Sequence, residues 1–127
     1  MIVRTVEQLA GTERDVSGAA WRSRRIVLRS DGMGVSMSWT EIHAGSEMTL
    51  WYKNHLECNL VIEGTGEVED CATGERHPLG PGTLYALDRH DRHVVRAHTD
   101  MKLVCTFTPP LTGRETHDAD GSYVVVE

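Results

Sequence analysis

Short alternations of apolar and polar residues run through most of this chain. The segment MKLVCTFT (101–108) places Leu103, Cys105 and Phe107 on one face of an extended strand and Val104 on the other, the two-residue period of a half-buried strand. Similar short segments, rich in β-branched and aromatic residues and bounded by glycine or polar turns, are WRSRRIVLRS, MGVSMSWTEIHA, MTLWYKNH, CNLVIEG, GEVEDC, GTLYALD and HVVRAH. Eight or more strands at this spacing predict an all-β sandwich or a closed small barrel.

The pattern also predicts the pieces around these strands. Val6–Ala10 is expected to form a short helix, and 11–18 a loop. Hairpin turns are predicted at Gly64–Gly66 and Thr73–Gly74, where glycine tolerates positive φ. The polar segment Pro109–Tyr123 follows a proline pair that stops the preceding strand, and it predicts a flap over the barrel mouth that is disordered without substrate. A tail docked on a partner subunit, or left mobile, is the alternative.

Length and composition narrow the setting. A chain of 127 residues predicts one domain, 1–127. The net charge of −6, from 19 acidic and 13 basic residues, lacks the basic stripe that nucleic acid selects. No basic segment precedes an apolar run and no span approaches about 20 apolar residues, so we expect a cytoplasmic protein without membrane contact. Cys58, Cys71 and Cys105 are odd in number and far apart, and are expected to be packed thiols.

Two segments keep the spacing of the paired motifs of small cupin barrels. The first motif, Gly-x5-His-x-His-x(3,4)-Glu-x6-Gly, is matched in spacing by Gly45, Trp51, Lys53, Glu57 and Gly64. The second, Gly-x5-Pro-x-Gly-x2-His-x3-Asn, is matched by Gly82, Asp88, His90, His93 and Ala97. The chain therefore resembles a divergent cupin barrel that retains Glu57 and His93, with a mouth where one ligand can sit. His90 stands where the frame has glycine, in the polar turn 88–92, and is expected to be exposed.

Longer phrases resemble a narrower family. YKNHLE, EGTGEVED, YALDRHDRH, the start MIVRT, the W-x-S-x-R stretch 21–25 and PPLTGRETHDADGSY are similar to the ectoine synthase family, over essentially the whole chain. The resemblance implies a hydro-lyase that closes N-γ-acetyl-L-2,4-diaminobutyrate into ectoine with loss of water, the last step of osmolyte biosynthesis under osmotic stress. It also implies a homodimer, whose interface exposed apolar strands at the N-terminal end could supply.

The same resemblance implies a catalytic metal, Fe²⁺ first, held by Glu57, Tyr85 and His93. A carboxylate, a phenolate and an imidazole suit a borderline divalent cation, so Zn²⁺, Co²⁺ and Mn²⁺ are alternatives. Three protein ligands leave positions open for substrate or water. Because a phenol ordinarily has a pKa near 10, Tyr85 would bind well only if the cation helped to remove its proton. The plainer interpretation is a solvated Glu57 and packed rings at the other two positions.

The family resemblance places four titratable residues toward the lumen as candidates for proton transfer: Tyr52, His55, Glu115 and His117. Which one is base and which is acid stays open; Glu115 is favoured as the group that binds the substrate ammonium or takes its proton. Residues expected to shape the pocket and anchor the substrate are Trp21, Arg25, Thr40, Leu87 and Phe107. Arg25 could receive a carboxylate as a planar fork, or belong to a solvated basic strand in RSRR. Trp21 and Phe107 read as pocket wall.

Two other functions fit parts of the pattern. A metal-dependent oxygenase or isomerase on the same barrel would prefer two histidines and one carboxylate, but Trp51 and Lys53 stand at the histidine positions. A non-catalytic binder would use Glu57, Tyr85 and His93 only as polar groups of a pocket. Metal content and sensitivity to chelators separate the binder from a metalloenzyme.

Overall fold

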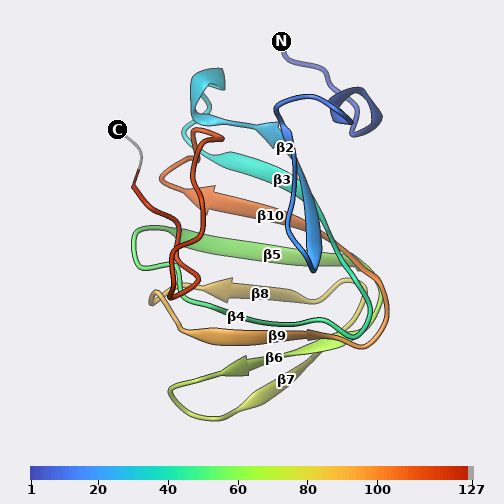
Figure 1. Cartoon of the computed structure of the whole chain (residues 1–127), viewed down its shortest axis with the longest axis vertical. Helices are drawn as coiled ribbons and strands as arrows, with labels where there is room; N and C mark the ends of the chain where they lie inside the picture. Colours follow the sequence, from blue (N-terminus) through green and yellow to red (C-terminus); the bar gives the residue numbers. More distant parts are fainter. Residues whose placement is uncertain (126–127) are drawn as a thin grey trace.

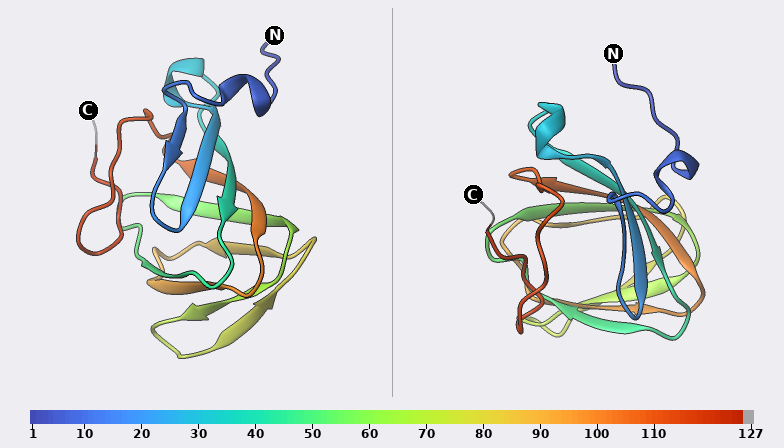
Figure 2. Two further views of the ribbon diagram at one scale, coloured as in Figure 1. Left: turned by 45° about the vertical axis from the view of Figure 1, so that its right-hand side comes forward. Right: turned by 45° about the horizontal axis from the view of Figure 1, so that its top comes forward.

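Two antiparallel sheets make up the protein, whose computed structural model describes residues 1–125 (Figure 1). The larger sheet has six strands in the order β1 (Asp15–Ser17), β2 (Trp21–Val27), β3 (Ser36–Ile42), β10 (Met101–Thr108), β5 (Leu56–Glu63) and β8 (Leu84–Leu87). The smaller sheet has four, in the order β4 (Glu47–Leu50), β9 (His93–Ala97), β6 (Gly66–Asp70) and β7 (Arg76–Leu79). The two sheets curve around a common interior (Figure 2), as the predicted all-β architecture requires.

Helical structure is confined to two single turns among the described residues, η1 (Glu7–Leu9) and η2 (Arg29–Asp31), both of the 3₁₀ type. The helix predicted over Val6–Ala10 is therefore present as the short turn η1, which buries Leu9. No helix within residues 1–125 has the length and apolar character needed to cross a membrane.

Strict alternation decides which side chains enter the interior. In β10, Leu103, Cys105 and Phe107 share one face, as predicted from the sequence, and they are buried together with Met101. In β5 the same period turns Glu57 inward and leaves its neighbours outside. Because β10 pairs with both β3 and β5, it lies in the middle of the larger sheet and carries buried residues along its whole length.

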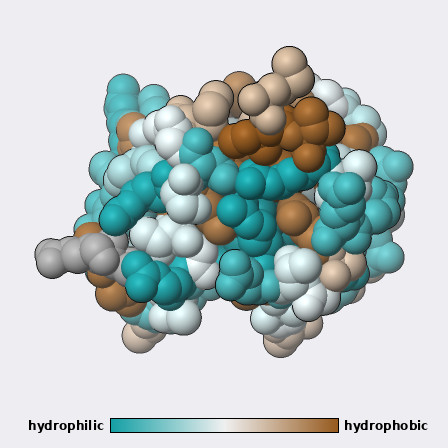
Figure 3. Space-filling model, turned by 90° about the horizontal axis from the view of Figure 1, so that it is seen from above, coloured by the Kyte–Doolittle hydropathy of each residue, from teal (hydrophilic) through white to brown (hydrophobic). Residues whose placement is uncertain are grey.

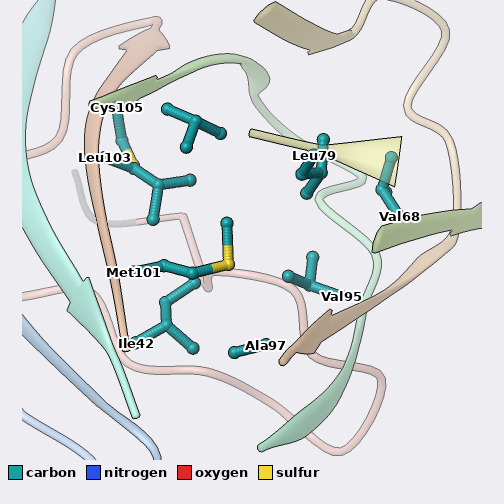
Figure 4. Packing of buried hydrophobic residues seen from close by; sticks show 9 residues of the cluster. Ile42, Val68, Leu79, Val95, Ala97, Met101, Leu103 and Cys105 are labelled. Atoms are coloured by element: carbon teal, nitrogen blue, oxygen red, sulfur yellow. The ribbon is translucent and has the colours of Figure 1, made fainter. Parts of the chain in front are cut away.

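The apolar core lies between the sheets and draws side chains from both (Figure 4). Its members are Ile42, Val61, Val68, Leu79, Val95, Ala97, Met101, Leu103 and Cys105. A second cluster lies at the end where the tail docks, and it is mostly aromatic: Leu28, Tyr52, Phe107, Leu111 and Tyr123. Burial of this apolar surface from both sheets is what holds them face to face.

The two predicted hairpins have different outcomes. Thr73–Gly74 does connect paired strands, since β6 and β7 are antiparallel neighbours and Gly74 has φ of 75°. The prediction at Gly64–Gly66 is wrong, because β5 belongs to the larger sheet and β6 to the smaller. The chain crosses between sheets there, and a Cβ at Gly64 or Gly66 would overlap the carbonyl oxygen of Asp100 or Arg96. These glycines serve close backbone approach.

The tail after β10 folds along one end of both sheets (Figures 1 and 2). Leu111, Ser122 and Tyr123 are buried in it. The backbone N–H of Trp51 donates to the carbonyl of Gly121 at 3.2 Å. This placement agrees with the predicted flap, and whether the flap is disordered without substrate stays a prediction.

The cysteine prediction is only partly right. All three thiols are free, and Cys105 is buried, but Cys58 and Cys71 are exposed. Cys58 faces outward because Glu57 and Asn59 on either side of it face inward.

The molecular surface at the top of Figure 1 is largely polar, and its most extended apolar patch lies near one edge of the view (Figure 3). Large apolar residues of the N-terminal segment, Met1, Ile2 and Val3, are exposed.

Candidate active site

A cavity of about 60 Å³ lies between the two sheets at the end covered by the tail, enough space for several water molecules. Eight of the twelve predicted site residues line it: Trp21, Arg25, Thr40, Tyr52, Glu57, Tyr85, Phe107 and His117. They come from β2, β3, β5, β8, β10, the connector before β5 and the tail. His55, Leu87, His93 and Glu115 lie outside its lining.

Arg25 is the buried cation of this cavity. Its side chain is 2% exposed, and Nη1 donates to the carbonyl of Gly113 at 3.2 Å. The flanking arginines Arg22 and Arg24 lie on the opposite face of β2 and pair with Asp15 and Glu41. The interpretation of RSRR as a solvated basic strand therefore fails for Arg25, which presents a planar fork suited to a carboxylate.

Tyr52 and His117 form a hydrogen-bonded pair in the cavity wall, with 3.0 Å between the Tyr52 hydroxyl and His117 Nε2. Burial raises the pKa of Tyr52 well above its ordinary value. The pKa of His117 is lowered, first by burial and then by the positive charge of Arg25. Both groups are therefore neutral at pH 7 and share one hydrogen bond. His117 also stacks on Tyr123, at 4.3 Å between ring centroids.

The three predicted metal ligands approach from both sheets. Glu57 in β5 pairs with Leu87 in β8, so Tyr85 lies diagonally next to it on the inner face. His93 begins β9 in the other sheet, and its ring centroid is 6.4 Å from that of Tyr85. His93 lines an adjoining groove together with Tyr85 and Leu87.

Burial controls the protonation of these three groups. It raises the pKa of Glu57 to about 7 and the pKa of Tyr85 well above its ordinary value, where the Glu57 charge adds to the effect. Burial lowers the pKa of His93. Without a compensating cation, the neutral forms of all three groups are favoured at the expense of the charged ones.

The orientation of His93 fits a metal ligand. Its Nδ1 lies 2.9 Å from the carbonyl oxygen of Asp91, which can only accept, so Nδ1 carries the proton. The lone pair of Nε2 is then buried without a hydrogen-bond partner among residues 1–125. A buried acceptor without a partner, such as this Nε2, destabilises the folded protein, and coordination of a cation would offset that cost. Within the same residues no three His, Cys, Asp or Glu side chains are grouped to hold a cation, so Tyr85 would have to complete the set.

Glu115 faces its own loop and not the cavity. Its carboxylate is buried and accepts hydrogen bonds from the backbone N–H groups of Thr112, at 2.9 Å, and Gly113, at 3.0 Å. Burial acts to raise the pKa of Glu115, but the hydrogen bonds from Thr112 outweigh it and the net shift is downward. In this arrangement the carboxylate holds the Thr112–Gly113 turn, and its role toward the substrate stays a prediction.

The remaining predicted residues surround the cavity. His55 is buried, its pKa is lowered by burial, and its ring meets Phe107 edge-on at 6.0 Å. Leu87 is buried, and it lines a second groove together with Glu57 and Phe107. Lys53, at a histidine position of the cupin frame, points away and pairs with Asp120 above the Trp51 ring.

Sequence reasoning did not single out several lining residues, among them Asn59 and Tyr123. Asn59 lies two positions after Glu57 on the same strand face, so the alternation of β5 could have found it. The fold of the tail places Tyr123 in the cavity wall, through a β-bridge with His117. No local sequence pattern predicts this position.

Comparison with known proteins identifies relatives over the full length. The family model described as "Ectoine synthase" matches residues 1–127. The L-ectoine synthase of Desulfosudis oleivorans is 56% identical over 128 residues, which covers 100% of this chain and 99% of that protein. The crystal structure of ectoine synthase from P. lautus has a TM-score of 0.90 at 46% identity, covering 100% of this chain and 92% of that one.

More distant structures show the fold alone. A Cupin 2 conserved barrel domain protein from Salinispora arenicola has a TM-score of 0.67 at 17% identity, covering 84% of this chain and 87% of the other. The predicted cupin fold is thereby confirmed.

Proposed function

This chain belongs to the ectoine synthase family and is a lyase, and from that membership we propose that it converts N-γ-acetyl-L-2,4-diaminobutyrate into L-ectoine and water. We base the proposal above all on one observation: a buried guanidinium, that of Arg25, lines the same cavity as the hydrogen-bonded pair Tyr52–His117. An amino acid that must fold on itself needs both an anchor for its carboxylate and a group that moves protons.

Arg25 binds the substrate α-carboxylate in this proposal, since its guanidinium is buried and faces the cavity. Trp21 and Phe107 pack against the carbon chain, and Thr40 lies on the same wall. Confinement brings the α-amine close to the acetamide carbonyl before reaction, which reduces the entropy that ring closure must lose.

The reaction forms one bond and breaks another. The α-amine nitrogen bonds to the acetamide carbon, the carbon–oxygen bond breaks, and water leaves with a cyclic amidine behind. The nitrogen must lose protons and the departing oxygen must gain them. Tyr52 and His117 serve this transfer because a neutral imidazole can accept a proton and a neutral phenol can donate one.

Glu57, Tyr85 and His93 would hold a divalent cation, Fe²⁺ first and Zn²⁺, Co²⁺ or Mn²⁺ as alternatives, and the unpartnered Nε2 of His93 supports this assignment. Such a cation supplies Lewis-acid polarisation of the acetamide oxygen.

The tail contributes by closing the cavity. Tyr123 and His117 are both in its wall, and Glu115 keeps the preceding turn in shape through Thr112. Excluding bulk water favours a dehydration and strengthens polar interactions inside the site.

The setting follows from the same family. We propose a single domain, 1–127, that acts in the cytoplasm at the last step of osmolyte biosynthesis during osmotic stress, with no nucleic acid or membrane as partner. A homodimer is proposed as well, with the exposed apolar residues of the N-terminal segment in its interface.

The direct test is incubation of purified, Fe²⁺-loaded protein with the acetylated diamino acid, followed by chromatography for ectoine. Product is expected, with loss of turnover after chelation and recovery on adding Fe²⁺. Absence of product from metal-loaded protein would overturn the proposal. Tight binding of the substrate without turnover, indifferent to chelators, would favour the non-catalytic binder.

A further inference from the structure

His90 adopts an unusual backbone conformation in the loop between β8 and β9. Its φ is 53°, and it is the one non-glycine residue with positive φ among residues 1–125. Left-handed backbone is unfavourable for a residue with a Cβ, although histidine tolerates it better than most. This explains why the cupin frame has glycine at the position, and it raises the question of what the imidazole contributes in return.

The imidazole binds two backbone carbonyls of a different segment. Nδ1 of His90 lies 2.9 Å from the carbonyl oxygen of Tyr52 and 3.1 Å from that of His55. A carbonyl oxygen only accepts, so Nδ1 must carry the proton and share it between the two. The residue is exposed, as predicted from the sequence, so its other ring nitrogen can be solvated.

The contact joins two connectors that run between the sheets. Residues 51–55 lead from β4 in the smaller sheet to β5 in the larger, and residues 88–92 lead from β8 in the larger sheet to β9 in the smaller. Strands of different sheets share no ladder of backbone hydrogen bonds. A side chain that ties the two connectors together therefore fixes the spacing between the sheets at this end.

Both connectors lead directly into candidate site residues. The first carries Tyr52 and His55 and ends one residue before β5, which presents Glu57. The second carries Asp91, whose carbonyl oxygen accepts the hydrogen bond from His93 Nδ1–H, and it ends directly before His93, the first residue of β9.

We propose that His90 is a positioning residue that holds Glu57 in one sheet at the correct distance from His93 in the other, through its Nδ1–H contact with the Tyr52–His55 connector. The inference rests on one part of the proposed function, namely that Glu57 and His93, with Tyr85, hold a divalent cation. His90 itself touches neither the cavity nor the cation.

Two substitutions separate the backbone from the imidazole. His90→Gly accepts the positive φ but removes the donor, while His90→Asn accepts the conformation and retains an N–H donor. Arg89→Ala, at an exposed neighbour in the same loop, is the matched control. We measure Co²⁺ affinity by the visible absorption of the bound ion, and kcat and KM separately.

His90→Gly is expected to weaken Co²⁺ binding about tenfold, in line with the loss of an outer contact at metal sites. His90→Asn recovers part of that affinity, and Arg89→Ala keeps the affinity of the unmodified protein. The value of kcat falls in the glycine variant with little change in KM, because Arg25 is not disturbed. Unchanged Co²⁺ affinity in the glycine variant, or equal losses in the glycine and asparagine variants, overturns the proposal.

A measurement on the unmodified protein covers the case in which the variants fail to fold. Long-range ¹⁵N–¹H correlation spectra of the neutral imidazole should show His90 with the proton on Nδ1, and a proton on Nε2 alone refutes the contact. The two proposals can fail separately. Ectoine formation with unaltered Co²⁺ affinity in His90→Gly refutes only the positioning role, and weakened Co²⁺ binding in a protein that makes no ectoine refutes only the reaction.

Discussion

Replacing Arg25 by methionine should remove most of the binding energy between the protein and the substrate carboxylate. Methionine has a similar length and remains apolar, so the change removes the guanidinium from a side chain that is 2% exposed without opening a large cavity. Within the protein Nη1 donates to the Gly113 carbonyl and the side chain also hydrogen-bonds to Tyr123, whereas Nε has no partner among the described residues. A guanidinium carries five N–H groups, so Nε–H and others remain available to a ligand.

The magnitude follows from hydrogen bonds to charged groups, which contribute about 1.5–3 kcal/mol each. Loss of a two-bond contact should therefore cost about 3 kcal/mol or more, and each 1.4 kcal/mol is a factor of ten. We expect kcat/KM to fall about 100-fold, mostly through a higher KM, because the carboxylate is bound alike in the ground state and the transition state. Arg25→Lys should recover little, since an ammonium lacks the planar fork.

A second signature lies in the pH dependence. Arg25 lowers the pKa of His117 in addition to the larger effect of burial. Removing the guanidinium should raise that pKa, so the acidic limb of the kcat/KM profile should move to higher pH.

The assay is steady-state ectoine formation at several substrate concentrations from pH 6 to 9. Arg22→Met is the control, because Arg22 lies on the outer face of the same strand and pairs with Asp15. A KM in Arg25→Met equal to that of the control variant would refute the assignment of the carboxylate site.

Three further predictions concern the carboxylates and the tail. Metal-free Glu57→Gln should be more stable than the unmodified protein at pH 8 in denaturant titrations, because burial raises the pKa of Glu57 to about 7. A carboxyl pKa that is higher in the folded state makes the free energy of unfolding fall as the pH rises from the pKa of the unfolded chain through that of the folded protein. An identical pH dependence of stability in both proteins would contradict this. Truncation after Thr108 should abolish ectoine formation but leave the far-ultraviolet circular dichroism of a β-protein, with a lower Tm because the packing of Leu111 and Tyr123 is lost; normal turnover would disprove the lid. Glu115→Gln should lower kcat without moving the pH profile, since the carboxylate holds its own turn and does not face the cavity; a displaced profile would restore its assignment as a base.

Periodicity alone predicted the faces of the strands well. The alternation in β10 and the inward orientation of Glu57 follow from a period of two that burial of one sheet face imposes. The same parity separates Arg25 from Arg22 and Arg24, so the open question about RSRR could have been decided by counting from Trp21.

Tertiary placement was less accessible from sequence. A glycine pair looks the same whether it makes a hairpin or allows a sheet crossing, which is why Gly64–Gly66 was misassigned. The approach of Tyr123 to His117 depends on the path of the tail, and the orientation of Glu115 depends on a turn that its own carboxylate organises. The ligand set of Glu57, Tyr85 and His93 came from family resemblance, since no spacing rule unites residues on three strands of two sheets.

The inward positions of β5, Glu57, Asn59 and Val61, all carry odd numbers. Inserting one residue after Leu56 would reverse this parity, presenting thiol and leucine side chains to the cavity and a carboxylate to solvent. Evolutionary changes in length within this strand should therefore come in twos, and single insertions should be confined to the connectors.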